Sequence, residues 1–516
     1  MSSHHTPQSI TRFRYILTVI DPYYKTLAQF LARRSFSVGG SNYSFSLLIL
    51  FSLFLLLYHL NSTYLTNWDE AWYAAIARDM ATSHDFITPT YNGRVWFAAS
   101  PLYLWLLAFW FQLTHFNVAG VRLISTFFTL GSVVLTYLIG LRLTNRRTGL
   151  IAGFILITSI GFLYRARTGN LDTPLTFFHL LAVFSWLQGR HHPRWYWGIG
   201  LASALGFLTK NIFGLLPLSL LLLTPFSAAI PTLLIFFLAV LPWPLLAYSR
   251  HGMAFVRSHL LQYAFSKMSN SDPTPGAGFW WYFLQLKPGL KLWVLFLPIA
   301  FTLPLVQFVR NSSIIRINSI LIRTIRKLFP YLWLLLPLIA LSFTALKNNW
   351  YLIPFYPAAA IVIALFWDHL IKLEIIKYWQ QLVIGLIVAI GLFNISLYWH
   401  QFVVPETVAA EARLSSLAGQ LAPPSNPIML DDAYQPIAVF YSNHRVYPLR
   451  YSRAYESLVG DPELSVATAS GARLVLTNQQ NLDQLLTAFH HPQYMTLQTA
   501  DDKLLIRLSF PNDSNQ

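Results

Sequence analysis

Three carboxylates stand out in a sequence that is otherwise poor in acids. Asp69 and Glu70 are adjacent in the stretch NWDEAWYAAIARDM, shortly after a long apolar run at 44–60. Between residues 86 and 367 the only acids are Asp172 and Asp272. An acid close to a membrane segment is costly, so it usually serves a function. A carboxylate there could take a proton from an attacking hydroxyl or amine, or hold a divalent cation.

Helix capping is the competing interpretation for two of these acids. Asp69 would be the N-cap of a helix over 70–81 that lies on the outer surface. Asp172 would cap a helix whose first turn holds Pro174 and would pair with Arg165 or Arg167. Capping explains only one of the two adjacent carboxylates, and it predicts acids at many helix ends, where this sequence has almost none. We favour function. A divalent cation (Mg, Mn or Zn) is kept as a candidate cofactor, with Asp69 and Asp172 as its candidate ligands.

Several basic residues fall on the same predicted side of the membrane as the acids. They are Arg165, Arg167, Lys210, Arg257, Lys267 and Lys347. Cations that run against the positive-inside trend indicate an anionic ligand, and phosphate is the natural one. Contact with lipid headgroups is the alternative. His259 is a further candidate for this site, although a single histidine is more often structural.

The composition is that of a membrane protein. Of the 516 residues 55% are hydrophobic and only 11% are charged, whereas soluble domains carry about 25% charged residues. The absence of cysteine excludes disulfides, thiol catalysis and cysteine metal sites. A nucleic-acid partner is not expected, because the basic residues are scattered among the apolar stretches. We expect no cleaved signal peptide, because the first residues are polar.

The apolar stretches predict a polytopic α-helical protein with about 11–13 transmembrane helices. The predicted spans are 44–60, 119–141, 148–164, 174–188, 195–209, 212–224, 228–248, 292–309, 329–346, 351–367 and 380–399. The apolar segment 101–113 is short for a span, which favours an interfacial or re-entrant helix.

Lysine and arginine in the loops predict the orientation and the domains. Basic loops place a cytoplasmic N-terminal segment (1–43) inside, and the first outer loop (61–118) outside. Residues 44–400 form the transmembrane domain of a protein of the inner (plasma) membrane. Residues 401–516 carry 11 acids against 7 bases. Their short apolar runs predict a small soluble α/β domain on the outer, periplasmic side.

Five stretches in order resemble the membrane glycosyltransferases of the GT-C fold, in the branch of the bacterial protein O-mannosyltransferases and the lipid A aminoarabinose transferase. The resemblance covers about residues 44–400. The stretches are DEAWYAAIARDM (69–80), SPLYLWLLAFWFQLTHFNVAGVRLIS (100–125), LDTPLTFF (171–178), GFLTKNIFGLLP (206–217) and WYLIPFYPAAAIVIA (350–364).

The resemblance implies a reaction and a set of residues. Such enzymes transfer a sugar from a polyprenyl phosphate to a lipid, glycan or protein acceptor at the outer face of the membrane, by inverting displacement. Asp69 would be the base, with Glu70 and Asp172 as further catalytic carboxylates. The donor phosphate would be bound from a set that comprises Lys210, Arg165, Tyr351, Lys347 and Arg94. His259 and Lys267 are candidates in the second outer loop.

The sequence also departs from the family. The aminoarabinose transferase has Glu-Lys where Ala98 and Ala99 stand here, and its DExRY form has arginine at the position of Trp72. Two alternatives therefore stay open. One is a catalytically degenerate relative that acts as a membrane scaffold, and the other is a lipid or glycan transporter. No internal repeat of the kind common in transporters is evident.

Overall fold

The computed structural model describes residues 43–114, 116–265, 274, 276–310, 317–399, 409–431, 435–449, 471–488 and 491–509. The chain divides into two compact units, residues 1–47 and 48–516. In the first unit the described part is the beginning of helix α2 (Tyr43–Leu57). All contacts below lie within the second unit.

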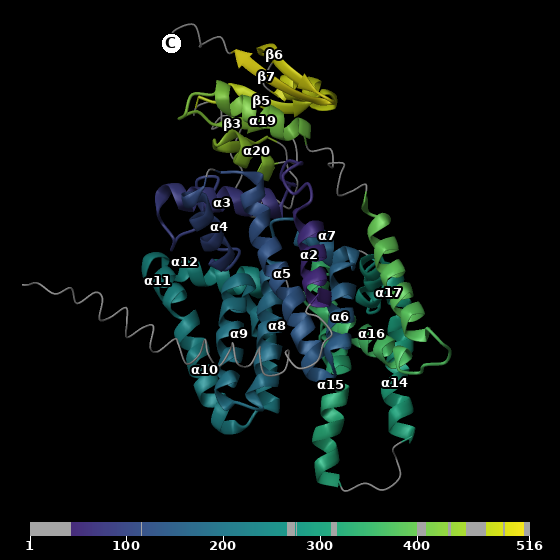
Figure 1. Cartoon of the computed structure of the whole chain (residues 1–516). Helices are drawn as coiled ribbons and strands as arrows, with labels where there is room; N and C mark the ends of the chain where they lie inside the picture. Colours follow the sequence, from purple (N-terminus) through teal and green to yellow (C-terminus); the bar gives the residue numbers. More distant parts are fainter. Residues whose placement is uncertain are drawn as a thin grey trace, which may run out of the picture. The chain divides into compact units, whose positions relative to one another are not determined.

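Helices make up most of the described chain, and every predicted span coincides with helix. The long or apolar elements are α5 (Val118–Leu143), α8 (Asp172–Gly189), α9 (Trp197–Lys210), α10 (Phe226–Val240), α11 (Pro242–His251), α13 (Trp281–Leu290), α14 (Phe296–Arg310), α15 (Ile317–Ser342), α16 (Tyr356–Ile371) and α17 (Trp379–Ser396). Helices α5, α8 and α9 lie side by side (Figure 1). Shorter pieces join them: η1 (Pro193–Tyr196), α12 (Met253–Phe255), η3 (Val256–Phe265), η4 (Lys291–Leu295) and η5 (Asn349–Phe355).

Six stretches of described helix are long and apolar enough to cross a membrane, and a bent pair would make a seventh. The six are Val118–Leu143, Pro193–Leu223, Phe226–His251, Trp281–Leu303, Asn349–Ile371 and Trp379–Ser396. Length and composition thus confirm a polytopic helical membrane protein. The number is below the predicted 11–13 because several predicted spans form shorter or broken helices.

The predicted span 148–164 is one of the broken helices. It forms α6 (Arg146–Ile157) and α7 (Ile160–Ala166), which are bent by 69° at the break. At the break Thr158 and Ser159 donate their hydroxyls to carbonyls one turn back, those of Phe154 and Ile155. Such hydroxyl bonds to the helix's own carbonyls are a known cause of bending. The bend sets the direction of α7, which carries Arg165.

A reversal of the chain follows α9. Asn211 has a φ of 49°, and the 3₁₀ helix η2 (Asn211–Leu223) then packs back on α9. A Cβ atom at Gly214 would lie 2.0 Å from the backbone nitrogen of Phe207, so only glycine permits this approach. Pro193–Leu223 therefore contains the two predicted spans 195–209 and 212–224, and Lys210 lies at the turn between them.

The predicted helix after Asp69 is α3 (Asp69–Ser83). It does not lie open on a surface: Ala71, Ala74 and Ile76 are fully buried. Helix α4 (Leu102–Leu113), the predicted interfacial segment, packs against it, and a short hairpin of β1 (Thr90–Tyr91) and β2 (Arg94–Val95) lies between them in sequence.

The C-terminal residues form a mixed five-stranded sheet with the order β4-β3-β5-β7-β6. The strands are β3 (Ile428–Leu430), β4 (Val446–Pro448), β5 (Leu474–Asn478), β6 (Gln493–Ala500) and β7 (Lys503–Ser509). The helices are α19 (Ala409–Leu421), α20 (Gln435–Ser442), η6 (Gln479–Asn481) and α23 (Leu482–Ala488). Strands β3, β4 and β5 are parallel, and β7 and β6 are antiparallel. The predicted α/β character is confirmed.

Candidate active site

Four charged side chains from four helices form a continuous chain of ion pairs. The Nη2 atom of Arg165 lies 2.9 Å from Oδ2 of Asp69 and 2.6 Å from Oδ2 of Asp172. The other carboxylate oxygen of Asp172 accepts a hydrogen bond from the Lys210 ammonium group. We call Asp69, Arg165, Asp172 and Lys210 the four-charge chain. It links residues that are up to 141 positions apart; Asp69, Asp172 and Lys210 lie in three of the five motifs, and Arg165 lies outside them.

Helix ends position all four members. Asp69 and Asp172 are the first residues of α3 and α8, while Arg165 and Lys210 lie in the last turns of α7 and α9. Acids are stabilised at helix N-termini and bases at C-termini by the helix macrodipole. Each group therefore sits where its own helix favours its charge, and the four helix ends meet in one place.

Neither acid caps its helix, so capping is wrong for both, whereas the expected pairing of Asp172 with an arginine is confirmed by its contact with Arg165. The residue before α3, Trp68, makes no side-chain cap bond and has a φ of 70°. At α8 the cap is Asn170, whose Oδ1 accepts from the backbone N–H groups of Asp172 and Thr173. The carboxylates of Asp69 and Asp172 are thus left for the ion pairs.

The members of the four-charge chain differ in their access to solvent. The side chain of Asp69 is 37% exposed, while that of Asp172 is 2% exposed. Within the described residues the Oδ1 atom of Asp69 has no hydrogen-bond partner. The Nε atom of Arg165 is buried and also lacks one there. The chain therefore has an open carboxylate oxygen at one end and a spare guanidinium donor beside it.

Aromatic rings line the two cations. The Arg165 guanidinium lies 5.7 Å from the ring centre of Trp350. The Lys210 ammonium lies 5.2 Å from the ring of Tyr351 and 5.8 Å from that of Phe213. These distances suit cation–π attraction. Tyr351 was predicted for this site, whereas Trp350 and Phe213 were not; their only signal is their place inside two of the motifs.

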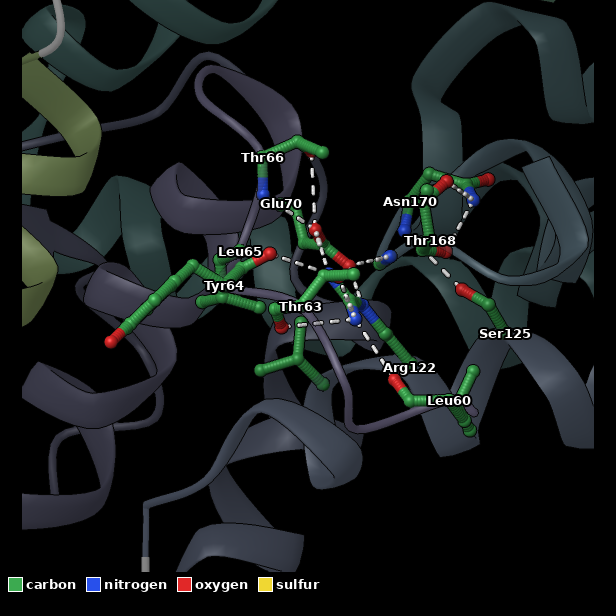
Figure 2. A network of polar contacts seen from close by, with 12 residues as sticks. Leu60, Thr63, Tyr64, Leu65, Thr66, Glu70, Arg122, Ser125, Thr168 and Asn170 are labelled. Atoms are coloured by element: carbon green, nitrogen blue, oxygen red, sulfur yellow. Dashed lines mark hydrogen bonds and ion pairs between the residues drawn. The ribbon is translucent and has the colours of Figure 1, made fainter. Parts of the chain in front are cut away.

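Glu70 lies one residue from Asp69 but belongs to a separate, buried network (Figure 2). Its two carboxylate oxygens lie 2.8 and 3.1 Å from Nε and Nη2 of Arg122. They also accept from the backbone N–H groups of Thr66 at 2.7 Å and Gly169 at 2.9 Å. The same Arg122 binds the carbonyls of Leu60 and Tyr64.

This network joins helix α5 to two segments that lead into members of the four-charge chain. It ties the loop before α3 to helix α5 and to the turn that leads into Asp172. Asn170 of that turn also donates to the carbonyl of Arg165 at 2.6 Å. Glu70 is fully hydrogen-bonded by its own chain, which suits a positioning role; a catalytic role for Glu70 stays a prediction. In the sequence, the partner of Glu70 could be recognised only as a single arginine, Arg122, inside an apolar stretch.

The C-terminal region braces the first outer loop at three places. Asn92 of the β1–β2 hairpin exchanges two hydrogen bonds with the backbone of Val446, at 2.7 and 2.8 Å. Arg78 of α3 donates to the carbonyl of Phe440 at 2.7 Å. The hydroxyl of Tyr441 accepts from the N–H of Leu65 at 2.9 Å.

Asp79, a further acid of α3, lies at the contact of Arg78 with the C-terminal region. Burial raises the pKa of the Asp79 carboxyl, although the adjacent Arg78 acts in the opposite direction. Asp79 pairs with Arg78 at 3.3 Å. This ion pair neutralises the arginine at the contact with α20.

Three other predicted residues lie away from the four-charge chain or outside the described residues. The ammonium group of Lys347 binds the carbonyls of Ser342 and Thr344, at 2.9 and 2.6 Å, and so closes the end of α15. Arg94 is exposed in β2, and Lys267 lies outside the described residues. Phosphate binding by these three stays a prediction.

His259 is buried beside the loop that precedes α4. Its Nδ1 atom lies 2.9 Å from the carbonyl of Phe97, and its Nε2 atom has no partner among the described residues. Burial lowers the pKa of the His259 imidazole to about 4, so this histidine is neutral at physiological pH. The contact fixes the backbone next to Ala98 and Ala99.

The position of the missing family lysine lies close to Lys210. Ser100, which follows Ala99, donates to the side chain of Asn211 at 2.9 Å, and Asn211 is the neighbour of Lys210. Ala99 itself is 1% exposed. Three of the predicted phosphate-binding residues, Lys210, Arg165 and Arg94, are candidates to replace the lost charge. Lys210 and Arg165 lie in the four-charge chain, and Arg94 does not.

A divalent cation held by Asp69 and Asp172 stays a prediction. The described residues contain no group of three or more histidine, aspartate or glutamate side chains arranged to hold a metal ion. Both oxygens of Asp172 and one oxygen of Asp69 already face cations of the chain itself. We therefore derive no step through a metal.

Comparison with known proteins shows the fold and the proteins that this chain resembles. The sequence profile of the dolichyl-phosphate-mannose-protein mannosyltransferase family matches residues 98–248. The structure of ArnT from Cupriavidus metallidurans bound to undecaprenyl phosphate superposes with a TM-score of 0.72, at 15% identity, over 90% of this chain and 98% of that one. The chain has the GT-C fold, and its sequence is similar to the ArnT and protein mannosyltransferase branch.

Two curated relatives of this GT-C protein carry transferase names. An undecaprenyl phosphate-alpha-4-amino-4-deoxy-L-arabinose arabinosyl transferase of Pectobacterium carotovorum is 30% identical over 68% of this chain and 64% of its own length. A second relative, undecaprenyl phosphate-alpha-4-amino-4-deoxy-L-arabinose arabinosyl transferase 1 of Pseudomonas fluorescens, is 30% identical over 60% of this chain and 56% of its own length. The chain thus spans less than two thirds of these relatives. The predicted family and fold class are confirmed.

Proposed function

We propose that this protein is a membrane glycosyltransferase that moves a sugar from a polyprenyl-phosphate donor to a lipid, glycan or protein acceptor. The observation that carries the proposal is the four-charge chain, which combines an accessible carboxylate with two cations. The support from similarity is that the named relatives are undecaprenyl phosphate aminoarabinosyl transferases, and that one fold neighbour was solved with undecaprenyl phosphate.

Asp69 is the general base of the proposed reaction. Its Oδ1 atom is open, while Arg165 holds Oδ2 at 2.9 Å and so fixes the direction of the carboxylate. An acceptor hydroxyl or amine that donates to Oδ1 is aligned for attack, and proton transfer to the carboxylate accompanies bond formation.

The proposed displacement forms one bond and breaks one bond at the anomeric carbon. The acceptor oxygen or nitrogen forms a bond to the anomeric carbon, and the bond from that carbon to the phosphate oxygen breaks. Its electron pair goes to the polyprenyl phosphate, and the acceptor proton goes to Asp69. Attack opposite to the leaving group inverts the anomeric configuration.

Arg165 and Lys210 stabilise the phosphate that leaves. Arg165 keeps a buried Nε donor without a partner among the described residues, and Lys210 contacts one acid only, Asp172. Asp172 holds both cations at fixed positions, so little reorganisation is needed as charge develops on the phosphate. Asp172 is in this proposal a positioning carboxylate. Tyr351, under the Lys210 ammonium, completes the phosphate side of the site.

The proposal includes an orientation. The positive-inside pattern places the four-charge chain and the C-terminal region on the outer, periplasmic face of the inner membrane, with the N-terminus in the cytoplasm. A lipid-linked donor suits this arrangement, because its chain remains in the bilayer while its phosphate reaches the cations.

Sugar transfer by the purified protein tests the proposal. Wild type is incubated with a panel of radiolabelled polyprenyl-phosphate sugars and a membrane extract as the acceptor pool. Asp69→Asn should reduce transfer by a factor of about 10²–10⁴, the usual contribution of a general base. Asp85→Asn is the matched control, because Asp85 lies in the same loop, pairs with an arginine and is also 37% exposed. Unchanged transfer by Asp69→Asn would refute the role of Asp69.

A scaffold without catalytic activity is the second candidate, and the two alanines at 98 and 99 favour it. Absence of transfer from every donor in the panel, with the protein folded, would support the scaffold and refute the enzyme. Movement of intact lipid or glycan without bond cleavage would instead support a transporter.

A further inference from the structure

An aromatic cluster adjoins the four-charge chain. It comprises Trp68, Trp72, Tyr73, Tyr91 and Trp96. The ring of Trp72 is central, with centroids 6.4 Å from Trp68, 5.3 Å from Tyr91 and 5.8 Å from Trp96. Tyr73 meets Trp96 edge to face at 6.5 Å. These are ordinary distances for interacting aromatic pairs.

The cluster runs from the surface at Asp69 into the protein. Trp68 precedes Asp69 and is 45% exposed, whereas Trp96 is 8% exposed. Trp72 is partly buried between them, and it follows Asp69 by three residues on α3. Residues three apart on a helix share a face, so Trp72 and Asp69 project to the same side. A group that reaches the open oxygen of Asp69 therefore lies beside the ring of Trp72.

Two members of the cluster have donors that the protein leaves unused. The indole N–H groups of Trp72 and Trp96 are buried and have no acceptor among the described residues. Buried donors in native proteins nearly always have a partner, so each exception needs an explanation. Of the neighbouring tryptophans, Trp105 donates to the carbonyl of Phe86 and Trp243 to that of Ile87, whereas the N–H of Trp110 also has no acceptor among the described residues.

The backbone around Trp96 is held in place without a ligand. The N–H of Trp96 donates to the carbonyl of Pro89 at 2.8 Å, and His259 binds the carbonyl of the next residue, Phe97. Asn92 anchors the hairpin to Val446. A site whose walls are fixed in advance loses little entropy when a ligand binds.

The cluster carries no charge of its own. Tryptophan stands at position 72, where the DExRY form of the family has arginine, and alanines follow Trp96 where the aminoarabinose transferase has Glu-Lys. Aromatic faces with N–H donors at their edges suit a ring that has apolar C–H faces and hydroxyl acceptors at its rim. A cationic or anionic sugar would find no counter-charge among these five side chains.

We infer that Trp72 and Trp96 bind a neutral hexose ring at the reacting end of the lipid-linked donor, and that these two residues select this class of sugar. The hexose hydroxyls accept hydrogen bonds from the two indole N–H groups, and the ring stacks in the cluster with its anomeric carbon toward Asp69. The inference rests on the proposed function, because it assumes a polyprenyl-phosphate donor.

Equilibrium binding of three radiolabelled lipids to the full chain in nanodiscs tests this inference. The lipids are polyprenyl phosphate, polyprenyl-phosphate glucose and polyprenyl-phosphate aminoarabinose. Wild type should bind the glucosyl lipid at least tenfold more tightly than the bare phosphate. Trp72→Phe and Trp96→Phe keep an aromatic ring but remove the N–H, and each should weaken glucosyl-lipid binding about fivefold, the value of one net hydrogen bond. Neither should change binding of the bare phosphate.

A matched variant controls for the loss of a buried indole N–H in general. Trp367 of α16 is also buried with an unpartnered N–H among the described residues, but it packs against Phe296 in another cluster. Trp367→Phe should leave all three affinities unchanged. Thermal unfolding of each variant verifies that it is folded.

The possible outcomes separate the inference from the proposed function. Equal binding of glucosyl lipid and bare phosphate, or wild-type binding by both tryptophan variants, would overturn the inference while the donor class stands. Tighter binding of the aminoarabinose lipid than of the glucosyl lipid would overturn it too. No binding of any of the three lipids would overturn the proposed function and the inference with it.

Discussion

Replacement of Glu70 by glutamine separates a positioning carboxylate from a catalytic one. Five donors meet the two oxygens of Glu70: the N–H and hydroxyl of Thr66, two nitrogens of Arg122 and the N–H of Gly169. In Glu70→Gln the amide nitrogen must replace one of these oxygens. In either orientation it then faces donors, so at least two hydrogen bonds are lost.

The expected cost follows from the burial of the pair. The side chains of Glu70 and Arg122 are 1% and 5% exposed, and the variant leaves the guanidinium charge without its carboxylate. Loss of one partner of a buried ion pair destabilises a protein by about 3–5 kcal/mol. Arg122 retains the carbonyls of Leu60 and Tyr64, which favours the lower end of this range.

Thermal unfolding in detergent and sugar transfer by the folded fraction are the two measurements. We expect Glu70→Gln to lower the melting temperature clearly, while the folded fraction keeps a pH profile of kcat like that of wild type. Glu374→Gln, a change of an exposed glutamate, is the control and should alter neither quantity. A normal melting temperature together with a loss of kcat as large as that of Asp69→Asn would refute the positioning role.

Three further predictions follow from the same contacts. Lys210→Gln should reduce kcat by about 10²–10³, as loss of an oxyanion donor does. Lys347→Gln should mainly lower the melting temperature, because that ammonium binds two backbone carbonyls and lies over the ring of Tyr282. Equal kcat losses in the two variants would contradict this division. Asn92→Ala should increase hydrogen exchange at 90–95 and 446–448, since it removes both bonds that join these segments; unchanged exchange would show that the brace does not depend on them. Treatment with EDTA should leave sugar transfer unchanged, because Arg165 and Lys210 already face the carboxylates of Asp69 and Asp172. Loss of transfer that Mg, Mn or Zn restores would contradict the proposed mechanism.

The C-terminal region gains a role from the structure that its sequence did not suggest. Its contacts with Leu65, Arg78 and Asn92 fall before, within and after α3, the helix that begins with Asp69. Its hydrogen bonds therefore act on the loop that carries the proposed base. Asp431, which follows β3, accepts a hydrogen bond from the Thr477 hydroxyl within the sheet.

Features that depend on neighbouring residues could be predicted well. Each apolar stretch became helix, because a membrane segment must satisfy its backbone hydrogen bonds internally. The α/β character of the C-terminal residues was predicted from their short apolar runs. Strand β6 was missed because most of its residues are exposed, so it lacks the alternation of apolar and polar residues that indicates a strand.

Features that depend on contacts between distant segments could not be predicted. The bend between α6 and α7 arises from the hydroxyls of Thr158 and Ser159, which are compatible with a straight helix in other settings. Adjacent Asp69 and Glu70 looked alike in sequence, yet one faces Arg165 and is partly exposed while the other is buried on Arg122.

The sequence by itself determined the membrane class, the helical stretches and the identity of the rare charged residues, because hydrophobicity and the cost of charge near a membrane act on each segment locally. Only the tertiary structure decided which charges meet. The four-charge chain requires four helix ends to converge, and that convergence depends on the bend before α7 and the glycine-dependent reversal after Lys210. Pairing over such separations is set by packing of the whole chain, which no local pattern records.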